Sequence, residues 1–131
     1  MPTNIVPIVM ALSQVNQGVS NWAKAVADGR PSRPSLKDML DRLSDLREEI
    51  VKALPPDQRE SFGPGVPAPD DGIRPAQERL TGLLRNVELS CGEQGSRIYP
   101  PERCHDSLKR MRDACDVLIR RAQAEYLTAP I

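Results

Sequence analysis

The sequence predicts an all-α protein, a four-helix bundle made of two helical hairpins joined by a long Pro/Gly-rich connection. Apolar residues recur at helical spacing in four segments, and no segment shows the period-two alternation that is typical of strands. Four amphipathic helices have to bury their apolar faces against one another, and a bundle is the simplest arrangement that does so. The 131 residues are close to the commonest domain size, so we expect a single helical domain over residues 1–131.

The first two predicted helices form one hairpin. The helix over residues 5–28 carries apolar residues at alternating steps of three and four, namely Ile5, Ile8, Leu12, Val15, Val19, Trp22 and Val26. Gly29 follows as a stop signal. The helix over residues 36–54 is expected to begin at a capping-box-like pair, Ser35 and Asp38, and to end before Pro55. The short link makes the two helices antiparallel neighbours.

The other two predicted helices form the second hairpin. They span residues 75–91, ending before Gly92, and residues 101–127, beginning after Pro100. The connection over residues 55–74 contains five prolines and three glycines in twenty residues. Such a segment allows either an antiparallel turn or a long crossover, so the topology between the hairpins stays open.

Hydropathy and cysteine usage predict a cytoplasmic protein with no membrane partner. The most apolar N-terminal stretch is interrupted by Pro7 and is too short to span a bilayer, and no basic region of a leader precedes it. Three cysteines are an odd set, which favours a reducing compartment and three small buried thiols. An alternative remains, because a hairpin between the last two helices would bring Cys91 and Cys104 together. Cys104 and Cys115 are too far apart along one helix to pair.

Few catalytic chemistries fit the residues present. His105 is the single histidine, so the Glu102-x-x-His105 spacing has no second copy with which to build a di-metal centre. Cys91, Cys104 and His105 lack the Cys-x-x-Cys pair that accompanies most structural zinc sites. No glycine-rich phosphate loop follows a strand. We therefore expect no catalytic residues, no metal and no cofactor, and a protein that is not an enzyme.

The charge balance disfavours nucleic acid as a partner. The chain has 18 Lys plus Arg and 18 Asp plus Glu, with aromatic residues at 3%. Binding through bulk electrostatics or base stacking needs a basic surface or several aromatic side chains. On the last helix, acidic and basic residues four apart predict a solvent-facing charge ladder, with the pairs Asp106–Arg110, Lys109–Asp113, Arg112–Asp116 and Asp116–Arg120.

Two surfaces and one loop residue are the candidate binding sites. Arg103, Arg110 and Arg121 fall within about 20° of one another around the last helix, at about 100° per residue, which makes a basic edge for an anionic ligand. Pairing with acids of a neighbouring helix is the alternative.

The first helix has no charged residue from Met1 to Ala23, which predicts that it is covered by a second copy, a protein partner or the Pro/Gly-rich connection. An uncharged polar surface is the alternative. Its outward polar residues include Gln14, Gln17 and Asn21. Phe62, the one phenylalanine, lies in the Pro/Gly-rich connection, where it either holds the loop to the body or contacts a partner.

These observations favour a non-enzymatic helical protein-interaction module, such as an adaptor, an inhibitor or a small regulatory subunit. A helical sensor domain for a small anionic molecule, such as a nucleotide, is the alternative, with the arginine edge or an interhelical pocket as its site. A nucleic-acid-binding accessory protein is a second alternative, which the neutral net charge disfavours.

Overall fold

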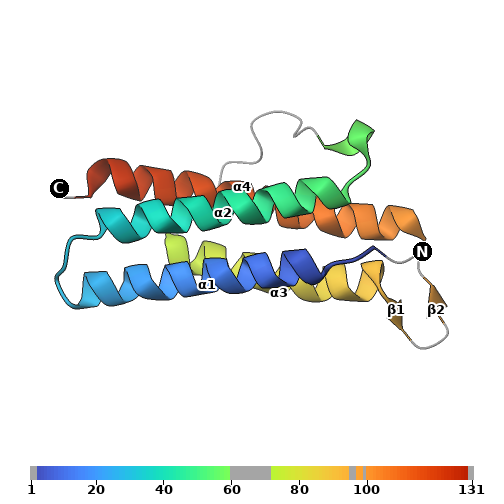
Figure 1. Cartoon of the computed structure of the whole chain (residues 1–131), viewed down its shortest axis with the longest axis horizontal. Coiled ribbons are helices and arrows are strands. Elements are labelled where there is room, and N and C mark those ends of the chain that lie inside the picture. Colours follow the sequence, from blue (N-terminus) through green and yellow to red (C-terminus); the bar gives the residue numbers. More distant parts are fainter. Residues whose placement is uncertain (1–2, 60–71, 95–96, 99, 130–131) are drawn as a thin grey trace.

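The computed structural model of the chain describes residues 3–59, 72–94, 97–98 and 100–129. Within them, four long helices lie side by side (Figure 1): α1 (Val6–Ala27), α2 (Arg33–Ala53), α3 (Ile73–Cys91) and α4 (Pro101–Thr128). A short 3-10 turn, η1 (Pro56–Gln58), follows α2. The all-α helical bundle predicted from the apolar stripes is therefore confirmed.

The second helix begins earlier than the sequence predicts. α2 starts at Arg33, with Pro34 in its first turn, where a missing N–H costs no hydrogen bond. Ser35 lies inside the helix, and its Oγ donates to the Ser32 carbonyl oxygen at 2.8 Å. The expectation that Ser35 and Asp38 cap this helix is therefore wrong, because the proline supports an earlier start.

The arrangement of the helices answers the open question of topology. α1 and α2 form one antiparallel hairpin and α3 and α4 the other, while α2 and α3 run in the same direction (Figure 1). α2 packs closely against α4, whereas α1 and α3 share the least contact of the packed helix pairs. Residues 60–71 of the connection lie outside the described residues.

Two very short strands join α3 to α4, although the sequence predicts none. β1 (Glu93–Gln94) pairs antiparallel with β2 (Arg97–Ile98), with Glu93 opposite Ile98 and Gln94 opposite Arg97. The reversal between the helices is tight, so backbone groups on its two sides come within pairing distance. Periodicity cannot reveal a ladder of two residues per strand.

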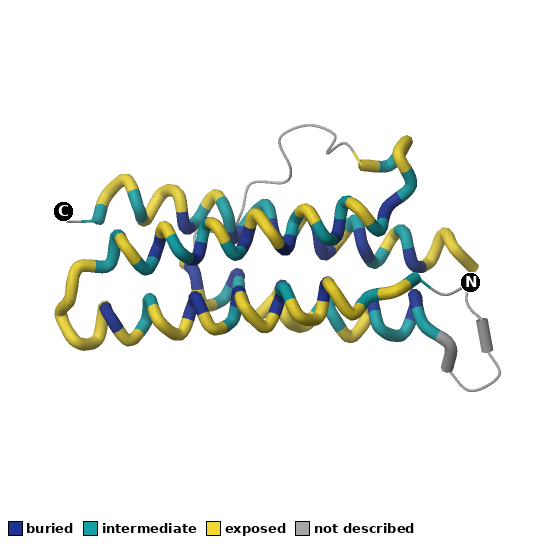
Figure 2. The backbone as a smooth tube through the Cα atoms, in the orientation of Figure 1, coloured by how far each residue is buried: buried dark blue, intermediate teal, exposed yellow. Residues whose placement is uncertain are grey.

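The predicted apolar stripes meet in one core. Dark blue segments face inward on the helices in Figure 2. On α1 the stripe is buried from Ile8 to Val19, but Val26 at its end is 52% exposed. Arg112 of α4 was expected on the solvent-facing ladder and is instead only 5% exposed. Its guanidinium donates to the Gln58 carbonyl oxygen at 3.1 Å and to Asp113 at 3.2 Å, because η1 covers this part of α4.

A disulfide joins the ends of α3 and α4. Cys91, the last residue of α3, is bonded to Cys104 in the first turn of α4, with a Cα–Cα distance of 4.6 Å. The expectation of three reduced cysteines is wrong for these two, and the hairpin alternative is confirmed. The tight β1–β2 reversal places the two helix ends opposite each other. Cys115 is a free, buried thiol.

Candidate functional site

The first candidate site is a groove between the N-terminal half of α1 and the facing side of α2. We call it the α1 groove, and its volume is about 500 Å³. α1 and the residues just before it supply uncharged side chains, while α2 supplies charged ones. The lining residues are Asn4, Val6, Pro7, Met10, Ala11 and Gln14 on one side, and Arg42, Asp45, Glu48 and Glu49 on the other.

The α1 side of the groove exposes large apolar side chains to solvent. Val6 is 58% and Met10 is 64% exposed, and Val9 next to them is 38% exposed. They lie off the buried stripe of α1, in a stretch without any charged residue. An exposed apolar cluster of this kind, bordered by polar groups, is typical of an interaction surface.

The α2 side of the groove is acidic. Among the described residues, Asp45 forms no hydrogen bond or ion pair. Glu48 and Glu49 each lie 3.6 Å from the Lys52 ammonium group. Arg42, the one basic residue of the lining, is held by Asp38 at 2.9 Å. The groove therefore combines an apolar wall with a wall of net negative charge.

Of the three polar residues predicted on α1, the structure places one in the groove. Gln14 lines it and accepts a hydrogen bond from Arg42 at 2.9 Å. Gln17 and Asn21 are exposed outside it and are hydrogen-bonded to each other at 2.9 Å. Val6 and Met10 were not among the residues predicted from sequence. Both are apolar and lie off the apolar stripe of the helix, which is the pattern that marks them.

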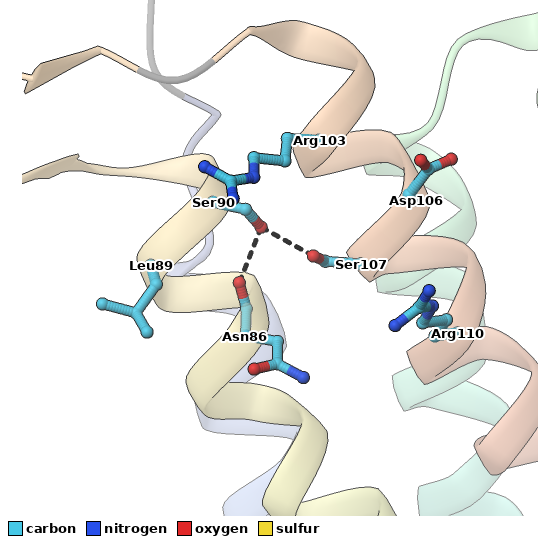
Figure 3. A pocket seen from close by; sticks show the side chains of 7 residues that line it. All are labelled: Asn86, Leu89, Ser90, Arg103, Asp106, Ser107 and Arg110. Carbon is cyan, nitrogen blue, oxygen red and sulfur yellow. Dashed lines mark hydrogen bonds between the residues drawn. The ribbon is translucent and has the colours of Figure 1, made fainter.

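The second candidate site is a cleft between α3 and α4, beside the disulfide. We call it the α3–α4 cleft, and its volume is about 400 Å³. Figure 3 shows its seven lining residues, which are Asn86, Leu89 and Ser90 of α3 and Arg103, Asp106, Ser107 and Arg110 of α4. The cleft therefore brings together two of the three arginines of the predicted basic edge.

The two helices meet through a pair of serines at the base of this cleft. Ser90 is buried, and its Oγ lies 2.7 Å from Ser107 Oγ and 2.6 Å from the Asn86 carbonyl oxygen. Arg103 and Arg110 lie on either side of this pair (Figure 3). Arg121 is half-buried further along α4 and does not line the cleft.

Two other sequence predictions concern Phe62 and metal binding. Phe62 lies outside the described residues.

Within the part of the chain that the structure describes, no group of three or more His, Cys, Asp or Glu side chains is arranged to hold a metal ion. His105 is half-buried beside Cys104, whose sulfur is engaged in the disulfide.

The only thiol outside the disulfide is protected from reaction. Burial, reinforced by the neighbouring Asp116 carboxylate and opposed by Arg47, raises the pKa of Cys115 to about 12. A nucleophilic cysteine needs the opposite shift, because the thiolate is the reactive form. Cys115 donates instead to the Leu43 carbonyl oxygen at 3.5 Å.

Over the described ranges, every helix is too short or too polar to cross a bilayer.

Comparison of the chain with protein-family models, with curated proteins and with solved structures gives no match.

Proposed function

We propose that the protein is a non-enzymatic interaction module that binds a positively charged amphipathic helix of another protein in the α1 groove. The observation that carries this proposal is the exposure of Val6 and Met10, at 58% and 64%, opposite the acidic side chains of α2. An adaptor, an inhibitor or a small regulatory subunit would each work through such a surface.

The chemistry of the two walls selects the partner. An amphipathic helix that lies in a groove buries apolar side chains at positions i, i+3, i+4 and i+7. Val6 and Met10 offer the apolar contact, and Asp45 beside them has no partner among the described residues. Lysine or arginine on the flank of the incoming helix would pair with Asp45, which an acidic helix could not do.

Self-association through α1 is the competing proposal for the same surface. A second copy would bring its own uncharged α1 to the apolar wall and would leave the acidic wall without a counter-charge. The acidic wall therefore favours a basic partner over a second copy.

The absence of enzymatic activity and the location of the protein stay predictions. The raised pKa of Cys115 supports a binding role over thiol catalysis. The Cys91–Cys104 disulfide weighs against the predicted cytoplasmic location, because disulfides persist in oxidising compartments.

Two synthetic peptides of equal length test the proposed partner chemistry. Both carry leucines at i, i+3, i+4 and i+7; one has lysines on the flanking positions and the other has glutamates. Fluorescence polarisation measures binding of each labelled peptide to the full chain. We expect the lysine peptide to bind and the glutamate peptide to bind at least about tenfold more weakly, since each tenfold change is about 1.4 kcal/mol.

Variants locate the binding. Met10→Glu and Asp45→Lys should each weaken binding of the lysine peptide. The first places a charge in the apolar wall, and the second reverses the charge of one side chain in the acidic wall. Leu127→Glu and Glu125→Lys make the same kinds of change on exposed positions of α4 and should leave binding unchanged.

Three results of the peptide experiment contradict the proposal. The peptides could bind equally, neither could bind, or the α4 controls could weaken binding as much as the groove variants. Light scattering that shows a dimer of the free chain, which Met10→Glu converts to a monomer, would assign the groove to a second copy.

A further inference from the structure

The α3–α4 cleft has a composition and an exposure that suit an anion, and it is separate from the α1 groove. We propose that this cleft binds a small organic phosphate, whose phosphate group is held between Arg103 and Arg110. The inference is independent of the proposed partner helix, because α1 contributes no residue to the cleft.

The two arginines project from one face of α4. They are seven residues apart, which is about two helical turns, so their side chains leave the helix in nearly the same direction. Both line the cleft between α3 and α4, and Figure 3 shows the Arg103 guanidinium reaching toward Ser90 of α3. Arg110 forms no hydrogen bond or ion pair with any described residue. A guanidinium offers two parallel N–H donors to a phosphate, which is the geometry of strong charge-assisted pairing.

One carboxylate, that of Asp106, also lines the cleft and reduces the positive charge of its lining. Asp106 is between the two arginines in sequence, but Figure 3 shows its carboxylate pointing away from both guanidinium groups. Counted over the seven lining residues alone, two side chains are positive and one is negative; Arg103 also interacts with the rest of the chain. A dianionic group is therefore attracted to the arginine side of the cleft.

The serine pair fixes the distance between the cleft walls. Ser90 Oγ donates to the Asn86 carbonyl oxygen at 2.6 Å and contacts Ser107 Oγ at 2.7 Å. The two serine hydroxyl protons are both used in these two hydrogen bonds, so the serines hold α3 against α4. The arginines are then the side chains that recognise the anion. The Asn86 side-chain amide, on the α3 wall, adds a neutral donor.

The volume of the cleft indicates more than a bare phosphate ion. About 400 Å³ lies within the range of pockets that hold small organic ligands. We therefore assign the cleft to a phosphate monoester that carries a small organic group.

The disulfide braces both walls of this cleft. Cys91 directly follows Ser90, and Cys104 directly follows Arg103. Cleavage by an added dithiol gives two thiols on the protein and an oxidised cyclic disulfide, and it releases the two walls from each other. We expect this reduction to weaken phosphate binding, since the arginines are then held less firmly.

Isothermal titration calorimetry in a phosphate-free buffer tests the proposal on the oxidised full chain. The probes are adenosine monophosphate, inorganic phosphate and uncharged adenosine. We expect the monophosphate to bind, inorganic phosphate to bind more weakly and adenosine not to bind. Arg103→Gln and Arg110→Gln should each raise the dissociation constant for the monophosphate about tenfold or more, the usual loss for one charge-assisted hydrogen bond.

Arg120→Gln is the matched control, because Arg120 is an exposed arginine of α4 outside the cleft. It should leave binding unchanged, and circular dichroism should show the same helix content for all variants. Amide chemical shifts of residues 86–91 and 103–110 should move when the monophosphate is added.

Four results would overturn the proposal. The first is no binding of either phosphate at millimolar concentration, and the second is equal binding of adenosine and its monophosphate. The third is tighter binding of inorganic phosphate than of the monophosphate, which would assign the cleft to the free ion. The fourth is binding that survives both arginine substitutions. None of these results bears on the peptide experiment at the α1 groove, so the two proposals fail separately.

Discussion

Arg42 of α2 crosses to α1 and donates from one nitrogen, Nη1, to two oxygens of Gln14. The distances are 3.0 Å to the backbone carbonyl oxygen and 2.9 Å to the side-chain oxygen. Its Nε is held at 2.9 Å by Asp38, one turn earlier on α2. The aliphatic part of Arg42 lies over Gly18, where α1 has no side chain to keep α2 away.

Replacement of Arg42 by methionine should therefore destabilise the α1–α2 hairpin. The substitution keeps an aliphatic stem and removes the donors to Gln14, so we expect a loss of about 1–2 kcal/mol in the free energy of unfolding. Urea denaturation followed by circular dichroism measures it. Arg120→Met is the control, because within the described residues the one hydrogen bond of Arg120 runs from its Nε to the Asp116 carbonyl oxygen of the same helix, at 3.4 Å. Equal losses for the two variants would show that the contact between the helices contributes nothing.

Two glycines inside helices should respond in opposite directions to a larger side chain. A Cβ at Gly82, in the middle of α3, would meet nothing within 4 Å. Gly82→Ala should therefore raise the free energy of unfolding by about 0.5–1 kcal/mol, because alanine favours the helix more than glycine does.

At Gly18 a Cβ would lie 3.1 Å from Arg42 Cδ and 3.5 Å from Met39 Cα. Gly18→Val adds further methyl groups in this contact and should cost about 1–3 kcal/mol by overpacking. Thermal unfolding of both variants checks the pair of predictions. A stabilised Gly18→Val variant would mean that the two helices can separate at little cost.

The Cys91–Cys104 disulfide should make a large contribution to stability. It closes a loop with a sequence separation of 13. In the loop-entropy model, a cross-link over about 15 residues is worth about 3 kcal/mol at 25 °C. Guanidinium denaturation of the native chain and of the Cys91→Ala/Cys104→Ala double variant should differ by about that amount. A single Cys115→Ala variant distinguishes loss of the cross-link from loss of a cysteine elsewhere in the core. A double variant as stable as the native chain would show that the cross-link does not constrain the unfolded state.

The helices and the arginine pair could be predicted from sequence, because each depends on spacing along one helix. The apolar repeat of α1 identified Ile8 and Val19 as core residues, and both are buried. The turn of about 100° per residue also placed Arg103 and Arg110 on one face. Arg121 shares their angle, but eleven more residues put it about 16 Å further along the axis, beyond the cleft.

The remaining features depend on which helices become neighbours, and a single sequence does not contain that information. Met10 of α1 and Asp45 of α2 line one groove because these two helices pack side by side. Arg112 is buried because η1 lies against α4, with the Gln58 carbonyl accepting its hydrogen bond. The spacing of Cys91 and Cys104 permitted either free thiols or a disulfide, and the tight reversal between α3 and α4 decided between them.

Cys115 links stability to pH in the alkaline range. Its pKa is raised from 9.0 to about 12, first by burial and then by the Asp116 carboxylate. Below pH 9 the thiol is protonated in both the folded and the unfolded chain, and its full contribution to stability is present. Above pH 9 the unfolded chain loses the proton while the folded chain keeps it, so ionisation favours unfolding until the pH reaches the folded pKa.

A Cys115→Val variant isolates this effect from the other groups that titrate at high pH. The native chain should lose stability relative to the variant by about 1.4 kcal/mol per pH unit between pH 9 and 12. Urea denaturation at a series of pH values measures the difference between the two free energies of unfolding. A difference that stays constant above pH 9 would show that the buried thiol ionises in the folded chain as readily as in the unfolded one. The hydrogen bond from the Cys115 thiol to the Leu43 carbonyl oxygen opposes such ionisation, because it requires the proton.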